Sequence, residues 1–128
     1  MLIFVYGTLL SGLERSYVLN SCDFISEAVA GSSCLYNLGS YPGIKKGDGA
    51  VVGELYEVDD ITLETLDMIE GFDSTNLNNS LYHRSEIKII LPNITTKVFA
   101  YFYNLPVVES MLIDDGDYRQ FLQSELII

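Results

Sequence analysis

Two short segments carry residue types that could do chemistry on a small molecule. The first is VYGTLL at residues 5–10, where an apolar run leads directly into Gly7 and Thr8. A glycine at that point forms either an ordinary turn or a place where the backbone approaches a ligand and presents N–H groups to it. The second is Glu70, which ends the segment DDITLETLDMIE at residues 59–70. Its carboxyl group is a candidate for proton transfer.

Glu70 stands out because of its place on a predicted helix. A helix turns by about 100° per residue, which puts Leu63, Leu66 and Ile69 in one apolar arc. Glu70 falls inside that arc, whereas Glu64 and Asp67 point elsewhere. The helix therefore places one carboxylate on its buried side, in its last turn.

Two interpretations of Glu70 follow from this pattern. In the first, the helix frays at Gly71 and Glu70 bends to solvent, where it sits at the unfavourable end of the helix dipole. In the second, Glu70 is a half-buried acid whose pKa is raised, because burial disfavours the charged form. Such a carboxyl group can both give and take a proton near neutral pH. The helical pattern alone does not choose between them.

Composition bounds the class of protein. The 128 residues are enough for one domain, residues 1–128, and 48% of them are hydrophobic, which argues against disorder. The net charge of -11, from 7 basic and 18 acidic residues, predicts no nucleic-acid partner and no anionic membrane surface. The apolar start lacks a basic segment before it, so a signal peptide is not expected, and no run approaches a membrane span. We expect a soluble cytoplasmic protein.

Potential metal ligands are scarce. Cys22 and Cys34 form no C-x-x-C pair, and His83 is the single histidine. A zinc site needs three or four such ligands, so we predict no metal site and two structural thiols in a reducing compartment.

The elements predicted to position these residues alternate without a regular β-α-β order. The sequence predicts an α+β fold with a small mixed β-barrel and short flanking helices. Strands are expected over residues 2–6, 27–38, 50–58, 82–91 and 95–105, and helices over 12–20 (capped by Ser11), 59–70 (capped by Asp59 or Asp60) and 117–123. Gly53, inside the third strand, indicates a bulge or a close backbone approach.

Taken together, these segments resemble the gamma-glutamylcyclotransferase-like family, in its gamma-glutamylamine cyclotransferase and avirulence-induced-gene-like branch. The resemblance spans nearly the whole chain and is carried by five motifs in order. They are VYGTLL with Gly12 after it, LGSYPGI (38–44), GELYEVDD (53–60), LDMIEGFDSTNLNNSLYHRSEI (66–87) and DDGDYRQFL (114–122).

The resemblance implies an enzyme that needs no cofactor. The substrate would be a gamma-glutamyl amine or gamma-glutamyl amino acid, whose own α-amine attacks its γ-carbonyl. The products would be 5-oxoproline and a free amine. Because the nucleophile belongs to the substrate, the enzyme needs orientation and one proton carrier. Glu70 matches the family's catalytic acid/base by position.

The resemblance also implies a substrate-binding loop. Tyr6, Gly7, Thr8 and Leu9 match the family's binding turn, in which backbone N–H groups hold negative parts of the glutamyl group. Tyr82 resembles a family tyrosine near the pocket, although core packing explains it equally well.

Other residues have weaker claims. Tyr41 is a candidate for the pocket mouth. Tyr118 and Arg119 are expected to dock the last helix by packing and ion pairing. His83 should face the other side of its strand.

Two questions stay open at this level. The rival to the enzyme is a binding module that holds a small carboxylate metabolite without turnover. The Asn-rich stretch 73–81 is either a lid or specificity loop, or a surface excursion. The motifs leave the leaving amine and the oligomeric state unassigned.

Overall fold

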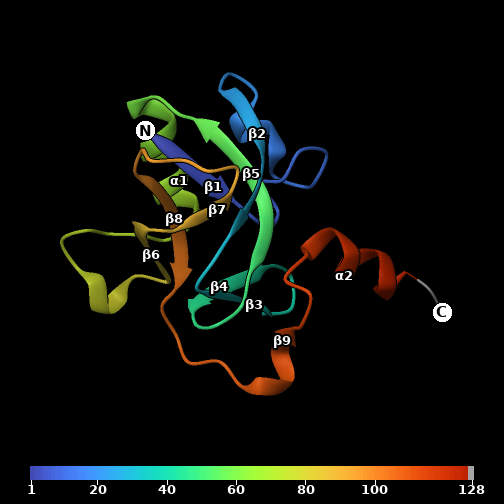
Figure 1. Cartoon of the computed structure of the whole chain (residues 1–128). Helices are drawn as coiled ribbons and strands as arrows, with labels where there is room; N and C mark the ends of the chain where they lie inside the picture. Colours follow the sequence, from blue (N-terminus) through green and yellow to red (C-terminus); the bar gives the residue numbers. More distant parts are fainter. Residues whose placement is uncertain (127–128) are drawn as a thin grey trace.

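The computed structural model describes residues 1–126, which form nine strands and two short α-helices (Figure 1). The predicted α+β class is confirmed. The strands are β1 (Leu2–Val5), β2 (Asp23–Ala30), β3 (Ser33–Asn37), β4 (Pro42–Lys46), β5 (Val51–Glu57), β6 (Tyr82–Glu86), β7 (Ile89–Leu91), β8 (Val98–Tyr103) and β9 (Leu112–Ile113). The α-helices are α1 (Asp60–Ile69) and α2 (Tyr118–Glu125), and 3-10 turns cover Ser16–Leu19, Leu77–Asn79 and Glu109–Met111.

The sheet is curled but is not a closed barrel. Its order is β7-β2-β5-β1-β8-β4-β3-β9, with β6 paired to β8. Within residues 1–126 the two end strands, β7 and β9, each pair with a single neighbour. The predicted barrel therefore has the right curvature, but the sheet does not close on itself.

The centre of the sheet is β1. It pairs antiparallel with β5 on one edge and parallel with β8 on the other, where Leu2 lies opposite Val98. The strand β8 then continues past the end of β1 and pairs with β4 at Phe102. The strands β1 and β4 thus lie one after the other along β8. Between them the chain leaves the end of β1 and continues as a loop.

Two predicted strands are each broken in two. The stretch 27–38 divides at Gly31 and Ser32, because Ser32 adopts a positive φ of 52° that no strand can hold. The stretch 82–91 divides after Glu86, so that β6 pairs with β8 while β7 pairs with β2. Local composition favoured strands in both places, but the chain changes partner strand in the middle.

The helix predicted over 12–20 is wrong. Only a 3-10 turn forms, at Ser16–Leu19, and it is preceded by Arg15 rather than capped by Ser11. Ser11 instead donates its backbone N–H to the Glu54 carboxylate on β5, at 2.8 Å. Ser11, which the local pattern predicts as a helix cap, thus bonds instead to an acceptor far away in the sequence.

The helix α1 is confirmed, with Asp59 as its cap. The Asp59 carboxylate accepts the Thr62 N–H at 2.8 Å, and Asp60 is the first helical residue. Leu66 is fully buried, and Leu63 packs against the core. Gly53 on β5 is also as predicted, because a Cβ there would overlap the Val5 carbonyl and the Phe4 ring.

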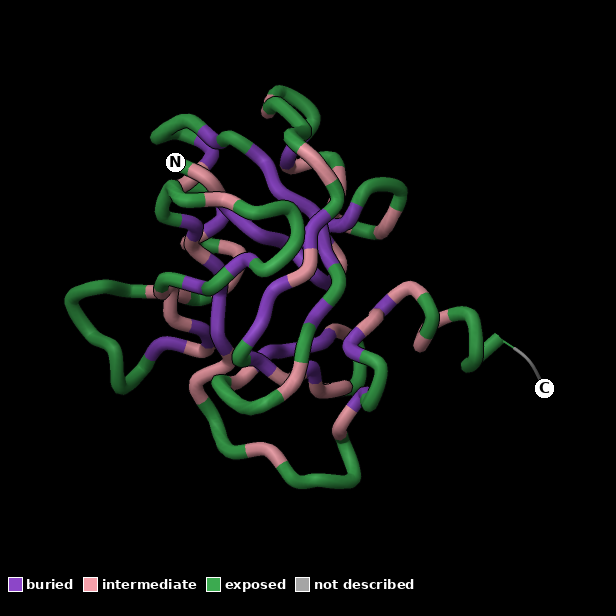
Figure 2. The backbone as a smooth tube through the Cα atoms, viewed as in Figure 1, coloured by how far each residue is buried: buried purple, intermediate pink, exposed green. Residues whose placement is uncertain are grey.

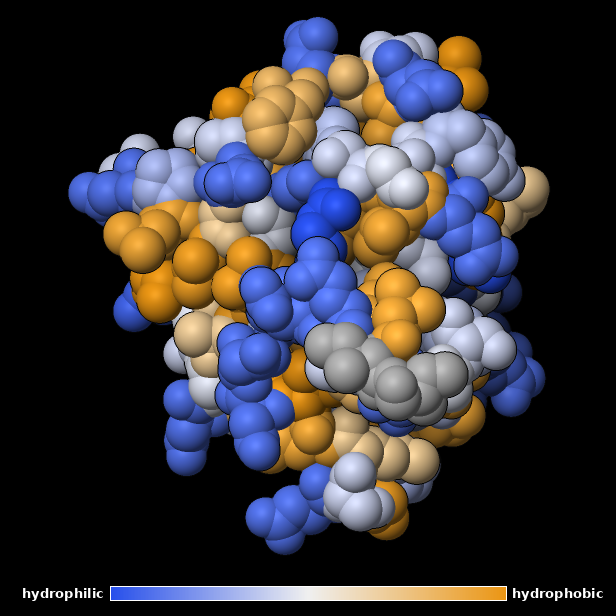
Figure 3. All heavy atoms as spheres, turned by 90° about the vertical axis from the view of Figure 1, so that its right-hand side faces the viewer, coloured by the Kyte–Doolittle hydropathy of each residue, from blue (hydrophilic) through white to orange (hydrophobic). Residues whose placement is uncertain are grey.

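Most buried residues lie on the strands and most connecting residues are exposed (Figure 2), but Tyr6, Gly7, Leu9 and Leu10 in the loop after β1 are buried as well. On the side that carries α2, hydrophilic side chains are distributed among hydrophobic ones (Figure 3). Within residues 1–126, no helix combines the length and the apolar composition that a membrane crossing requires.

Candidate active site

A cavity of about 130 Å³ lies where the end of β1, the start of β4, the end of α1 and the start of β6 meet. Every residue predicted for the site lines it, and these are Glu70, Tyr6, Gly7, Thr8, Leu9 and Tyr82. The structure thus brings the loop at residues 6–9 next to Glu70, which lies about 60 residues further along the chain. Their roles in binding and catalysis remain predictions.

The direction of Glu70 is set by the way α1 ends. Glu70 is the C-cap residue, and Gly71 follows with a positive φ of 63°. The Gly71 N–H donates to the Met68 carbonyl, and the Phe72 N–H donates to the Asp67 carbonyl at 2.9 Å. These two bonds form a Schellman motif, which ends a helix sharply and needs a residue that tolerates the left-handed conformation. The helix therefore does not fray, and Glu70 lines the cavity instead of bending to solvent.

Burial changes the acidity of Glu70. Removal from water raises the pKa of its carboxyl group to about 7, and the positive charge of Arg15 opposes this only in part. No hydrogen bond contributes to the shift. A carboxyl group with a pKa near neutrality exists in both forms at neutral pH, which is the property a proton carrier requires.

The 6–15 loop offers hydrogen-bond donors to the same cavity. Among the acceptors of residues 1–126, none receives the N–H of Gly7, Thr8 or Leu9. The carbonyl groups of this loop are used: the Gly7 carbonyl accepts from Leu10, and the Thr8 carbonyl accepts the Arg15 N–H at 2.8 Å. Three successive free donors next to a cavity suit a carboxylate or a carbonyl oxygen that gains negative charge.

Gly7 is required for a reason different from the expected one. A Cβ on Gly7 would lie 2.6 Å from Cγ of Pro42. The missing side chain thus allows the loop to pack against the first residue of β4. This contact closes one wall of the cavity, since Pro42 also lines it.

The two predicted tyrosines use their hydroxyl protons inside the protein. Tyr6 donates to the Tyr101 carbonyl at 2.7 Å, and Tyr82 donates to the Pro42 carbonyl at 2.8 Å. Burial, with the nearby Glu70 charge, raises the pKa of both phenols far above the usual value, so they stay protonated. They shape the cavity with their rings, and their oxygens remain available only as acceptors. Tyr41 also lines the cavity, as its position in SYPGI predicted.

Arg15 is the functional candidate that sequence reasoning missed. Its side chain lines the cavity, and its charge acts on Glu70. In the part of the chain that the structure describes, the other two arginines, Arg84 and Arg119, form ion pairs, whereas Arg15 forms none. No local signal in the sequence separates Arg15 from the other basic residues, because the lack of an ion pair becomes visible only in the structure.

The segment of α1 before Glu70 is held by an Asp67 cluster, made of Asp67, Arg84 and Tyr101. One guanidinium nitrogen of Arg84 contacts both carboxylate oxygens of Asp67, at 2.6 and 2.7 Å. The Tyr101 hydroxyl donates to the same carboxylate at 2.6 Å. Since Arg84 lies on β6 and Tyr101 on β8, the cluster fixes the end of α1 to the sheet.

The Asn-rich stretch projects away from the sheet, and within 73–81 only Leu81 lines the cavity (Figure 1). Ser80 is buried and bonded to Asp73 and Asn76, and the Asn104 side chain donates to the Leu77 and Ser80 carbonyls. The stretch is thus bonded within itself and to the segment after β8. It is a surface excursion in this structure. His83 is outside the cavity lining and stacks on Phe102.

Metal-ligand groups are dispersed. Across residues 1–126 no three His, Cys, Asp or Glu side chains lie close enough to hold one ion together. The site therefore has one carboxyl group, one guanidinium group, three backbone donors and several aromatic rings as its working parts.

Comparison with known proteins points to one family. Residues 3–120 match the model for "Gamma-glutamyl cyclotransferase, AIG2-like". The gamma-glutamylcyclotransferase family protein YtfP of Escherichia coli is 31% identical over 118 residues, which cover 92% of this chain and 96% of that one. The gamma-L-glutamyl-butirosin B gamma-glutamyl cyclotransferase of Niallia circulans is 29% identical over 119 residues, covering 91% and 76%.

The fold agrees with this match. The crystal structure of an uncharacterized protein from Pyrococcus horikoshii superimposes with a TM-score of 0.76 at 24% identity, over 98% of this chain and 96% of that one. With the family model spanning almost all of the fold, this chain belongs to the gamma-glutamylcyclotransferase family.

Proposed function

We propose that this protein converts a gamma-glutamyl amine or gamma-glutamyl amino acid to 5-oxoproline and releases the amine, with Glu70 as the general acid/base. The single observation that carries the proposal is a half-buried, unbonded carboxyl group with a pKa of about 7 that shares a cavity with three free backbone donors. The Niallia circulans relative, a gamma-glutamyl cyclotransferase for gamma-L-glutamyl-butirosin B, supports the reaction class.

The proposed step balances without a cofactor. The α-amine nitrogen of the substrate attacks the γ-carbonyl carbon, and a five-membered ring closes. Glu70 accepts a proton from that nitrogen, and the carbonyl oxygen becomes an oxyanion that the N–H groups of Gly7, Thr8 and Leu9 stabilise. The amide C–N bond then breaks, and Glu70 returns the proton to the departing amine.

Arg15 is assigned the α-carboxylate of the glutamyl group. A guanidinium group binds carboxylates in a fixed geometry, and Arg15 lacks a carboxylate partner of its own among the described residues. Holding both ends of the glutamyl chain would bring amine and carbonyl together, which can contribute several kcal/mol to the rate. The rings of Tyr41 and Tyr82 would cover the apolar methylene groups.

The test is mass-spectrometric detection of 5-oxoproline. The purified protein is incubated with gamma-glutamyl amino acids, gamma-glutamyl amines and gamma-glutamyl-ε-lysine, beside the Glu70→Gln variant. We expect release by the wild-type protein and none above background by the variant. Thermal shifts without turnover across the panel would instead identify a binding module.

A further inference from the structure

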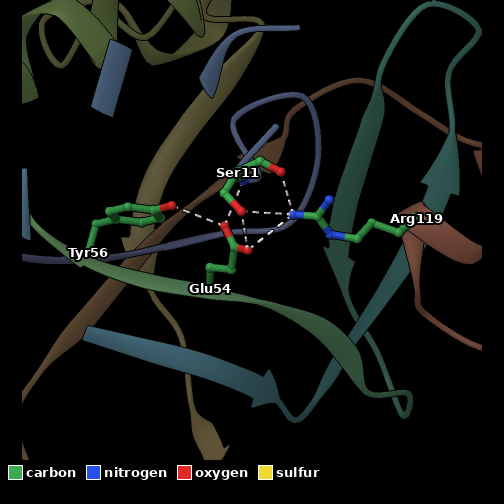
Figure 4. Close-up of polar contacts among 4 residues, drawn as sticks. All are labelled: Ser11, Glu54, Tyr56 and Arg119. Carbon is green, nitrogen blue, oxygen red and sulfur yellow. Dashed lines mark hydrogen bonds and ion pairs between the residues drawn. The ribbon is translucent and has the colours of Figure 1, made fainter. Parts of the chain in front are cut away.

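A second buried carboxylate lies behind the loop side of the cavity. Glu54 on β5 is 6% exposed, and its side chain is the centre of a Glu54 cluster that also contains Ser11, Tyr56 and Arg119 (Figure 4). One carboxylate oxygen accepts the Ser11 N–H at 2.8 Å and the Tyr56 hydroxyl at 3.1 Å. The other accepts the Ser11 hydroxyl at 3.2 Å and an Arg119 nitrogen at 3.1 Å. None of these four residues lines the cavity.

Ser11 is the point where this cluster holds the 6–15 loop. Its N–H and hydroxyl go to Glu54, and its carbonyl accepts from Arg119 at 2.7 Å. All of its polar groups are thus bonded to residues from β5 and α2. Arg119 contacts the Ser11 carbonyl more closely than it contacts Glu54, so it bonds directly to the loop.

Hydrogen bonds within the loop connect Ser11 and its neighbours to the residues that line the cavity. Leu10, next to Ser11, donates to the Gly7 carbonyl at 3.0 Å, and Arg15 donates to the Thr8 carbonyl at 2.8 Å. The loop has no helix or strand from residue 6 to residue 15. Its position therefore depends on tertiary contacts: the hydrogen bonds of Ser11, the packing of Gly7 against Pro42, and the burial of Leu9 and Leu10 in the core.

We propose that Glu54 and Arg119 are positioning residues, through which the C-terminal helix α2 sets the place of the backbone donors of Gly7, Thr8 and Leu9 and of Arg15. The catalytic part of this inference rests on the proposed function. The structural part does not, because it concerns where the loop lies.

Loss of Arg119 should move the loop without unfolding the protein. Its side chain is partly exposed, so removal leaves the Ser11 carbonyl open to water. Glu54 keeps three of its four donors. A displacement of the donors by a fraction of an ångström weakens the interaction with the transition state more than the interaction with bound substrate. The effect should therefore appear in kcat more than in KM.

The experiment compares Arg119→Met with Lys97→Met as the matched control. Lys97 pairs with Glu86 at 3.6 Å on the surface. It precedes Val98, which lies opposite Leu2 at the start of β1, whereas the 6–15 loop leaves the other end of that strand. The first readout needs no substrate: the amide ¹H and ¹⁵N shifts of Gly7, Thr8 and Leu9 are measured well below the melting temperature. The second is kcat and KM for the best substrate of the panel. Arg119→Lys tests rescue.

We expect Arg119→Met to shift the three amide resonances and to lower kcat about tenfold. Lys97→Met should do neither, and Arg119→Lys should recover part of kcat because one donor can still reach Ser11. Unchanged amide shifts in folded Arg119→Met would overturn the inference, as would a fall in melting temperature with unchanged kcat. If the wild-type protein has no turnover, the proposed function fails, and the amide shifts alone then decide the positioning role.

Discussion

The end of α1 and the 6–15 loop both line the cavity, and they hold their working groups in different ways. The end of α1 is regular: a Schellman motif at Gly71 orients Glu70, and the Asp67 cluster ties the helix to β6 and β8. The loop has no regular structure and depends on the Glu54 cluster, whose partners come from β5 and α2.

The two regions share one arrangement despite this difference. Each has a carboxylate that is fully bonded and does not line the cavity, Asp67 in one and Glu54 in the other. Each also presents a group that is left unbonded inside the cavity: the Glu70 carboxyl in one, and the Arg15 guanidinium with the loop N–H groups in the other. From this comparison we infer that the paired carboxylates hold the site together, and we propose that the unpaired groups act in it.

The largest effect should come from Glu70→Gln, which removes the proton carrier and keeps the shape. We expect kcat to fall by about three orders of magnitude, within the range for loss of a general acid/base. The matched control is Glu64→Gln, an exposed carboxylate on the same helix, which should retain wild-type kcat. Initial rates of 5-oxoproline release measure both, and comparable activity in the two variants would remove Glu70 from the mechanism.

The next effect is the dependence of stability on pH. Burial raises the pKa of Glu70 from 4.5 to about 7, so the folded protein holds this proton more tightly than the unfolded chain does. The contribution of Glu70 to the free energy of unfolding is therefore largest below pH 4.5, and it falls by up to about 3 kcal/mol as pH rises through about 7. Activity should show the opposite trend, since the base must be ionised.

Urea unfolding of the wild-type protein and of Glu70→Gln over this pH range isolates the contribution of Glu70 to the free energy of unfolding. The variant should gain stability relative to wild type with rising pH and level off above about pH 7. A difference that stays constant with pH would mean that the Glu70 carboxyl is not desolvated. The Glu70→Gln variant thus tests the role of Glu70 in catalysis through kcat, and its raised pKa through the pH dependence of stability.

A smaller effect is expected for Arg15→Gln on the loop side. Loss of a charge-assisted contact with the α-carboxylate should raise KM about tenfold. The decisive comparison uses a substrate in which a carboxamide replaces the α-carboxylate. Wild type should bind this analogue more weakly than the true substrate, and Arg15→Gln should barely distinguish the two. If the variant discriminates as well as wild type does, the carboxylate is bound elsewhere.

The smallest effect in this series is expected for Asp67→Asn. The variant keeps the shape of the side chain but weakens the contacts with Arg84 and Tyr101, which should lower the free energy of unfolding by about 1–2 kcal/mol. Because the Schellman motif is retained, kcat should fall only a few-fold. Chemical denaturation and initial rates measure the two quantities. A loss of kcat as large as that of Arg119→Met would show that both regions depend equally on their bonded carboxylates.

The two regions also differ in how well the sequence predicts them. On the helix side the helix and the place of Glu70 in its apolar arc were predictable, because these signals lie within one segment. The sequence does not decide whether the helix frays at Gly71, since that depends on how the helix end packs. The family motif predicted the loop residues but not what holds them. Ser11 resembled a helix cap, whereas its real partners, Glu54 and Arg119, are 43 and 108 residues away. No local pattern encodes such a pairing.

The place of β1 in the sheet has a consequence for how the protein is made. Leu2 and Ile3 pair with Val98 and Phe99, so during synthesis β1 must wait for β8, the eighth of the nine described strands, before its second edge is paired. Contacts so distant in sequence slow folding, because a large loop must close before they form. The cavity is lined by residues from Phe4 to Tyr101 and therefore forms only after β8 has been synthesised. A nascent chain that stops before β8 will carry both Glu70 and the YGTL motif and yet have no site.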